Sequence, residues 1–257
     1  MPDRPTPEIT SLQNPRVKAV AKLRDRRARD AAGRFLIDSR RDLDRAVAAG
    51  IEIETIYATE LLDVASVVVS RAVLEKMSYR QSPDGLLAVA VTPPPRPLPN
   101  VAANDLILVT VGTQKPGNLG AMARAAAAAG CRAMVAAGPN IDLWNPNAIR
   151  NSTGAIFALP IAVAPEAEVL AWLGEQTAQA VAAVVHGSES LWTARMETER
   201  ATVIIVGPEH AGLSTEWLSK IDSHVRIPQA DEAVDSLNAA TAAALLLFEV
   251  VRRRSIA

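Results

Sequence analysis

Continuous apolar runs alternate with segments of helical periodicity over the C-terminal part of the chain. Apolar runs of strand length occupy residues 105–111, 133–137, 180–185 and 202–206. Helices are predicted between and after these runs, over residues 119–129, 166–177, 214–221 and 236–253. Uninterrupted apolar strands that alternate with helices are typical of a parallel sheet with both faces covered. The pattern therefore predicts an α/β fold for this part of the chain.

The N-terminal part has shorter elements and ends at a run of prolines. Short strands are predicted over residues 34–37, 54–58, 67–69 and 86–91, with helices over 38–49 and 70–78. The segment Thr92–Asn100 reads TPPPRPLPN, and its five prolines can continue neither a helix nor a central strand. We therefore expect a small α/β domain over residues 1–92, a semi-rigid linker over 93–100 and a larger α/β domain over 101–257.

Composition excludes several classes of protein. The 257 residues are 49% hydrophobic and 21% charged, which provides enough apolar material for a core and excludes global disorder. One cysteine and three histidines argue against a disulfide scaffold and against a zinc site, so no metal is expected. The polar N-terminus does not resemble a secretory signal, and no apolar run is long enough to cross a membrane. The expected location is the cytoplasm.

Charge is concentrated near the N-terminus, although the net charge of the chain is only −1. The segment Arg16–Arg34 contains eight Lys and Arg residues against two Asp residues. A thin apolar stripe at helical spacing runs through it, formed by Val17, Val20, Ala21 and Leu23. The segment is interpreted either as a solvated helix face or as a surface that binds phosphates.

Three turns of the larger domain carry candidate chemistry. They are Thr113–Arg124 (TQKPGNLGAMAR), Val206–Ser214 (VGPEHAGLS) and Val225–Asn238 (VRIPQADEAVDSLN). Each lies at a strand end or a helix start, which is the edge where open α/β sheets bind ligands. Taken singly, each turn also has a purely structural interpretation: Asn118 and Ser236 are suitable helix caps, and Arg124 is an ordinary exposed arginine.

Together, and in this order, the three turns resemble the motifs of the SpoU/TrmH family of RNA 2′-O-ribose methyltransferases, in the SPOUT superfamily. The family's first motif, PGNLGAxxR, is matched by Pro116–Gly120 and Arg124. Its second motif, GxExxGLS, is matched by residues of the segment 207–214, and its third by Ile227, Pro228 and the SLN of 236–238. Residues 11–18, 33–38 and 69–91 resemble the family's N-terminal substrate-binding domain, which has a ribosomal-protein-like α/β fold.

The resemblance implies a fold, a cofactor and a reaction. The larger domain is expected to contain a deep trefoil knot that binds S-adenosylmethionine, whose methyl group is transferred to a ribose 2′-hydroxyl. The implied cofactor-binding residues are His186, Gly187, Gly207, Ile227 and Leu237. The implied catalytic residues are Arg124, with Asn118, Glu209, Ser236 and Asn238 around it. The implied RNA-binding residues of the basic segment are Arg16, Lys18, Arg24, Arg26, Arg27 and Arg29.

The partners implied by the resemblance are RNA and a second copy of the chain. Ribosomal RNA is the expected substrate, because the N-terminal domain resembles that of members that act on rRNA; tRNA remains an alternative. A catalytically silent RNA-binding relative is a second alternative, which a methyl-transfer assay would distinguish. A nucleotide-binding oxidoreductase is a third, but the first turn lacks the G-x-G-x-x-G pattern that such a protein needs.

Overall fold

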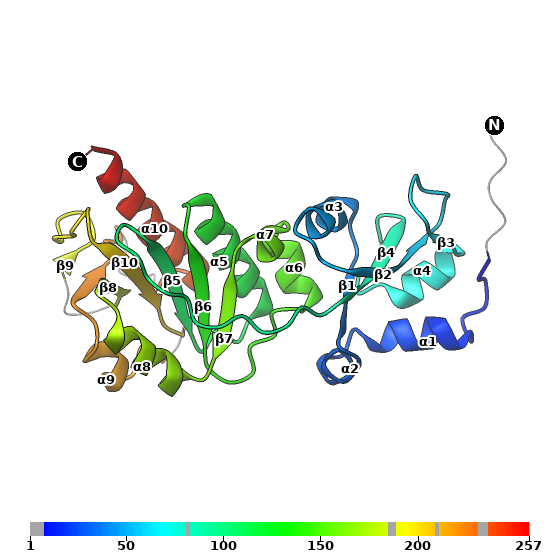
Figure 1. Ribbon diagram of the computed structural model, residues 1–257, viewed down its shortest axis with the longest axis horizontal. Helices are drawn as coiled ribbons and strands as arrows, with labels where there is room; N and C mark the ends of the chain where they lie inside the picture. Colours follow the sequence, from blue (N-terminus) through cyan, green and yellow to red (C-terminus); the bar gives the residue numbers. More distant parts are fainter. Residues whose placement is uncertain (1–7, 81–82, 185–188, 209–210, 231–235, 257) are drawn as a thin grey trace. The chain divides into compact units, whose positions relative to one another are not determined.

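Two units make up the fold of the protein (Figure 1). The computed structural model describes residues 8–80, 83–184, 189–208, 211–230 and 236–256. The first unit contains Met1–Pro94 together with Asp142–Ala158, and the second contains Pro95–Ile141 and Leu159–Ala257. The division between Pro94 and Pro95 falls inside the proline-rich segment where a linker is predicted. Residues 142–158 were expected in the larger domain, and they belong to the first unit instead.

A four-stranded sheet forms the centre of the first unit. Its strand order is β1 (Arg34–Ile37), β4 (Leu86–Val91), β2 (Ile53–Ala58) and β3 (Val67–Val68). β4 pairs antiparallel with β1 and β2, and β3 adds to the edge in parallel. The helices of the N-terminal segment are α1 (Pro15–Lys22), α2 (Arg26–Ala32), α3 (Arg40–Ala48) and α4 (Arg71–Met77).

The basic segment folds as two helices, α1 and α2. Most of the predicted apolar stripe is buried: Val17, Val20 and Leu23 lie in the core of this unit, whereas Ala21 is half-buried. The chain turns after Leu23, and the Asp25 carboxylate then accepts a hydrogen bond from the amide of Ala28 at 3.3 Å and caps α2. The two helices therefore place their basic side chains in different surroundings, and these side chains differ in their exposure to solvent.

Residues 142–158 pack against the sheet of the first unit through aromatic rings. They form α6 (Pro146–Ser152) and α7 (Ala155–Ala158), which contact β1 and α3 respectively. The ring of Trp144 stacks on that of Phe35, with centroids 4.6 Å apart, and the Phe157 ring lies 6.2 and 6.4 Å from these two rings. Phe35 and Phe157 are buried and Trp144 is half-buried, so contact among the three large rings accounts for the packing of this segment here.

A seven-stranded sheet forms the second unit. Its strand order is β7 (Ile161–Ala164), β6 (Ala133–Ala137), β5 (Leu106–Val111), β10 (Ala201–Val206), β8 (Ala178–Ala183), β11 (Ser223–Arg226) and β9 (Glu189–Ser190). Every described strand pair in it is parallel. The helices are α5 (Pro116–Ala128), α8 (Glu166–Glu175), α9 (Thr215–Leu218) and α10 (Ala239–Ile256). The predicted α/β fold with a parallel sheet is confirmed.

Helices cover both faces of this sheet, with α5 and α10 on one side and α8 and α9 on the other (Figure 1). The chain runs outward from β5 through β6 to β7, whereas β10 continues the sheet in the opposite direction. The order of strands therefore reverses between β5 and β10. Ligands of open α/β sheets bind beyond the carboxyl ends of the strands at such a point.

Neither unit contains a membrane-spanning element among the described residues, because none of their helices is both long and apolar enough to cross a bilayer.

Candidate active site

The first and second motifs begin where β5 and β10 end. Gly112 follows β5 with a φ of +60°, a conformation that favours glycine, and its amide donates a hydrogen bond to the carbonyl of Ala137 at 2.8 Å. α5 then begins at Pro116. On the neighbouring strand, Gly207 and Pro208 follow β10 directly. Because β5 and β10 are parallel neighbours, both motifs emerge at the same edge of the sheet.

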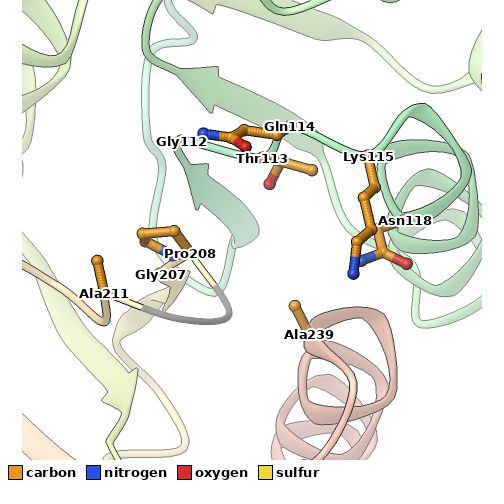
Figure 2. Close-up of a pocket in the computed structure, with 9 residues that line it drawn as sticks. All are labelled: Gly112, Thr113, Gln114, Lys115, Asn118, Gly207, Pro208, Ala211 and Ala239. Atoms are coloured by element: carbon orange, nitrogen blue, oxygen red, sulfur yellow. The ribbon is translucent and has the colours of Figure 1, made fainter.

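A pocket of about 180 Å³ lies at this edge (Figure 2). Its lining residues are Gly112, Thr113, Gln114, Lys115, Asn118, Gly207, Pro208, Ala211 and Ala239. Figure 2 shows Lys115 and Asn118 at the start of α5 facing the turn after β10, with the start of α10 below them. Residues of the first and second motifs, and Ala239 directly after the third, therefore meet around one cavity.

The first and third motifs are joined by a hydrogen bond. The side-chain amide of Asn238 donates to the side-chain oxygen of Asn118, with 3.1 Å between the two atoms. The side-chain oxygen of Asn238 accepts hydrogen bonds from the amides of Ala240 and Thr241, at 2.9 and 3.3 Å. Asn238 thus holds the start of α10 and the start of α5 together.

The helix cap predicted at Ser236 is wrong. α10 begins at Ala239, and Asn238 is the residue whose side chain accepts hydrogen bonds from the second and third amides of the helix. Ser236 lies two residues before the cap and is exposed. Both residue types are good caps, so the sequence did not distinguish between them.

Gly207 permits a tight turn at the second motif. A Cβ atom at this position would lie 2.9 Å from Cγ of Leu213 and 3.1 Å from its amide nitrogen. The chain after β10 therefore folds back against Gly207 so closely that any larger residue would displace it. Glu209, from the same motif, lies outside the described residues.

Three of the five predicted cofactor-binding residues lie in the described part of the chain. Gly207 lines the pocket, whereas Ile227 and Leu237 are half-buried and do not. Ile227 directly follows β11, and Leu237 directly precedes the cap of α10. His186 and Gly187 lie outside the described residues.

Arg124 lies on α5, beyond the part of the helix that lines the pocket. Its side chain is exposed, and it has no hydrogen-bond or ion-pair partner in the described part of the chain. The structure of the single chain therefore does not bring Arg124 together with Asn118 and Asn238 at the pocket. By contrast, the pocket is lined by Thr113, Gln114 and Lys115. These residues directly follow a predicted strand, and this position was a signal that could have identified them.

One of the predicted RNA-binding residues is buried. Arg29 is only 3% exposed. Its guanidinium group donates to the carbonyls of Leu23 and Arg24, at 3.0 and 2.8 Å, and to a carboxylate oxygen of Asp142 at 2.5 Å. Because all of these partners belong to the protein, the prediction that Arg29 contacts RNA is wrong.

The other basic residues differ in how available they are. Arg16, Lys18 and Arg27 are exposed. Arg24 donates to backbone carbonyls of α4 at 3.3 and 3.4 Å, and Arg26 forms an ion pair of 3.4 Å with Asp30. The exposed residues without such contacts are the best candidates for binding phosphate.

Cys131, the single cysteine, has no role in this site. Burial raises the pKa of its thiol to about 12, so the thiolate is not formed near neutral pH. In the described ranges, no group of three or more His, Cys, Asp and Glu side chains is arranged to hold a metal ion.

Comparison with known proteins identifies the family. Residues 105–248 match the SpoU rRNA methylase family, and residues 14–88 match the MRM3-like substrate-binding domain. The first match covers more than half of the chain. The chain therefore belongs to the SpoU rRNA methylase family, and the family resemblance predicted from its motifs is confirmed.

Relatives and solved structures match the chain over nearly its full length. A 23S rRNA (uridine(2479)-2′-O)-methyltransferase of Streptomyces viridochromogenes is 31% identical, over 91% of this chain and 88% of the relative. A solved RNA 2′-O ribose methyltransferase is 43% identical with a TM-score of 0.86, over 96% of this chain and 99% of the other. An AdoMet-bound rRNA methyltransferase of Sinorhizobium meliloti is 28% identical with a TM-score of 0.85, over 95% and 97% of the two chains.

Proposed function

We propose that the protein transfers a methyl group from S-adenosylmethionine to a ribose 2′-hydroxyl of ribosomal RNA. The observation that carries this proposal is a pocket lined by residues of the first two motifs and by Ala239 directly after the third, with Asn118 at the pocket hydrogen-bonded to Asn238. The activity named for the relatives supports it, since they are RNA and rRNA 2′-O-methyltransferases. Structures similar to this chain that contain AdoMet support the choice of cofactor.

Residues near the pocket fit the proposed cofactor. Ile227 and Leu237 are half-buried apolar side chains that flank one loop, and such side chains suit the face of an adenine ring. Gly207 keeps the backbone of a neighbouring turn free of a side chain, which suits close approach of a ligand. These residues would hold the cofactor, together with His186 and Gly187. When bound, the cofactor supplies a methyl group activated by a sulfonium.

The chain's own residues would bind and orient the ribose. Asn118 is held at the pocket by Asn238, so its amide is positioned to bond a sugar hydroxyl. Such positioning contributes as much as about 7–11 kcal/mol to lowering a barrier. Arg124 would orient the reacting hydroxyl or a neighbouring phosphate, because a guanidinium stays protonated and is a poor base. Glu209 and Ser236 would complete the surroundings of this arginine.

A homodimer is part of the proposal. The exposed side of α10 carries Phe248, which is 47% exposed, and the half-buried Leu245 one turn before it. A second copy packed against this apolar side would remove it from water. Dimerisation would also explain how Arg124, exposed and outside the pocket in one chain, takes part in catalysis at a composite site. Light scattering of the purified chain measures the oligomeric state.

The knotted path and the cytoplasmic location implied by the resemblance belong to the same proposal. The likeness of this chain to solved SpoU and RNA 2′-O ribose methyltransferases supports the knotted path. A cytoplasmic location fits an enzyme whose substrate is ribosomal RNA.

The test of the proposed function is nucleoside mapping. RNA from cells with and without the gene is digested, and 2′-O-methylated nucleosides are quantified separately in rRNA and tRNA. We expect one methylated rRNA position to disappear without the gene. Loss from tRNA alone would assign the tRNA alternative, and no change in either RNA would favour the silent RNA-binding relative.

A further inference from the structure

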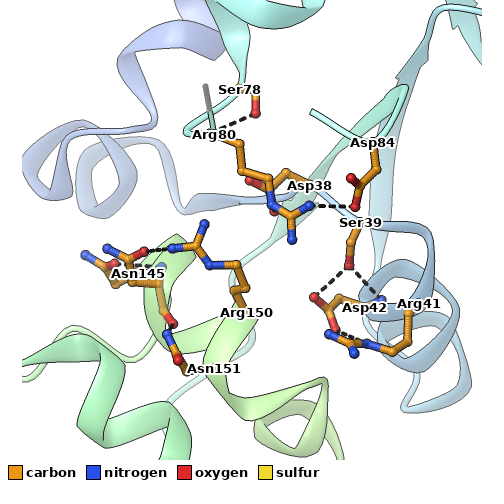
Figure 3. Close-up of polar contacts among 11 residues, drawn as sticks. Asp38, Ser39, Arg41, Asp42, Ser78, Arg80, Asp84, Asn145, Arg150 and Asn151 are labelled. Atoms are coloured by element: carbon orange, nitrogen blue, oxygen red, sulfur yellow. Dashed lines mark hydrogen bonds and ion pairs between the residues drawn. The ribbon is translucent and has the colours of Figure 1, made fainter. Parts of the chain in front are cut away.

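A polar surface of the first unit has no role in the site described so far. It is formed by α6 and by the chain that follows α4 (Figure 3). Figure 3 shows Arg80 beside Asp38 and Asp84, and Arg150 with its guanidinium directed toward the start of α6 near Asn145. Because α6 was expected in the larger domain, this combination of residues was not visible from the sequence.

Arg150 is the cation of this surface that no carboxylate neutralises directly. Arg80 forms ion pairs with Asp38 at 3.4 Å and with Asp84 at 2.5 Å. Arg150 is half-buried, donates a hydrogen bond to the side-chain oxygen of Asn147, and forms no ion pair with any described residue. Its charge acts on Asp38 only at longer range, where it opposes the rise in pKa that burial imposes on that carboxyl. Arg150 is thus oriented by a neutral partner, and no described carboxylate forms an ion pair with it.

An exposed aromatic ring lies next to this cation. Tyr79 is 40% exposed, and its hydroxyl accepts a hydrogen bond of 3.2 Å from the side-chain amide of Asn147. Asn147 therefore bonds to both the phenol and the guanidinium. The exposed Asn151 belongs to the same group of residues, because its side chain donates a hydrogen bond to the carbonyl of Asn147 at 2.8 Å.

The helix that carries these groups is fixed to its unit. α6 is capped by Asn145 and ends at Thr153, which has a φ of +50°. The following Gly154 packs so tightly against α3 that a Cβ atom there would lie 2.4 Å from Cδ of Arg45. The polar groups are therefore held in place before any ligand binds, which reduces the entropy lost on binding.

We propose that Tyr79, Arg150 and Asn151 form a binding site for an unpaired nucleotide of the RNA substrate. An exposed ring stacks on a base, a guanidinium pairs with a phosphate, and a side-chain amide bonds the edge of a base. A perfect duplex keeps its bases stacked on one another, so it cannot use the ring. The inference rests on the proposed function, since it assumes an RNA substrate, and it assigns part of RNA recognition to α6.

The test compares RNA binding by variants of the full chain. Fluorescence anisotropy measures binding to a single-stranded oligouridylate and to a perfect RNA duplex of the same length. We expect Tyr79→Ala to weaken single-strand binding about tenfold and duplex binding by less than about twofold. Tyr79→Phe keeps the ring and is expected to bind like the parent.

The charge of Arg150 is tested through the dependence of binding on salt. Arg150→Gln is expected to reduce the log–log salt slope for the single strand by about 0.7, the value for one lost phosphate contact. Arg71→Gln is the matched control, because Arg71 is an exposed arginine of the same unit that is already paired with Glu75. It is expected to leave the slope unchanged.

If Tyr79→Ala and Arg150→Gln both bind RNA as tightly as the parent does, and the parent binds RNA, the proposed site is overturned but the proposed function is not. Failure of the parent to bind RNA or to methylate rRNA would overturn both. Thermal melting of each variant shows whether its fold is intact.

Discussion

Asp142→Ala tests how residues 142–158 are held in the first unit. Asp142 is the only carboxylate that pairs with Arg29 among the described residues, and the Arg29 side chain is 3% exposed. After the substitution, its guanidinium keeps two backbone carbonyls as partners but has no counter-charge. Removing one partner of a buried ion pair costs about 3–5 kcal/mol. We expect about 3 kcal/mol, the lower limit, because the two carbonyls still solvate the cation.

The assay is chemical denaturation of the parent and the variant, combined with hydrogen exchange in α2 and α6. We expect a loss of unfolding free energy and faster exchange in both helices. Asp30→Ala is the matched control, because Asp30 is 67% exposed and pairs with Arg26 at 3.4 Å; such a surface pair contributes about 0.5 kcal/mol or less. Equal unfolding free energies of the two variants would show that the buried Arg29–Asp142 ion pair does not hold this segment in the first unit.

Three further predictions concern catalysis, RNA binding and pH. Arg124→Ala, and also Arg124→Lys, should abolish methyl transfer while calorimetry shows cofactor affinity within a few-fold of the parent. Replacing Arg16, Lys18 and Arg27 together by Gln should flatten the log–log salt slope of RNA binding by about two units, measured by titration at several salt concentrations. Hydrogen bonding from neighbouring arginines lowers the pKa of Glu249 from 4.5 to about 2. Its stabilising contribution is therefore complete above about pH 4.5 and is lost as the pH falls toward 2. Unfolding midpoints of the parent and Glu249→Gln should converge over that range.

Strong local patterns predicted most of the elements. The strand predicted over residues 133–137 has the observed bounds of β6, and the run at 86–91 is β4. Each is a continuous apolar run of strand length, and burial of such a run is favourable in any sheet that forms. Asn118 and Gly207 were singled out by their motifs, and both line the pocket.

Long-range packing could not be predicted from the sequence. Residues 142–158 follow a strand of the larger domain, but long-range contacts place them with the first unit, among them the stacking of Trp144 on Phe35 and the ion pair of Asp142 with Arg29. Arg29 has the same charge as Arg27, but one is buried against Asp142 and the other is exposed. The number of charged residues along a segment does not show which face of a helix is buried. The eight basic residues of the segment Arg16–Arg34 therefore suggested a larger surface for RNA than the structure exposes.

Transfer of a labelled methyl group to rRNA is the decisive measurement of the proposed activity. The purified chain is incubated with methyl-labelled S-adenosylmethionine and unmodified rRNA, which is then digested to nucleosides. We expect label in a 2′-O-methylated nucleoside with the parent and none with Arg124→Ala. Label on a base, or equal transfer by the parent and Arg124→Ala, would contradict this expectation.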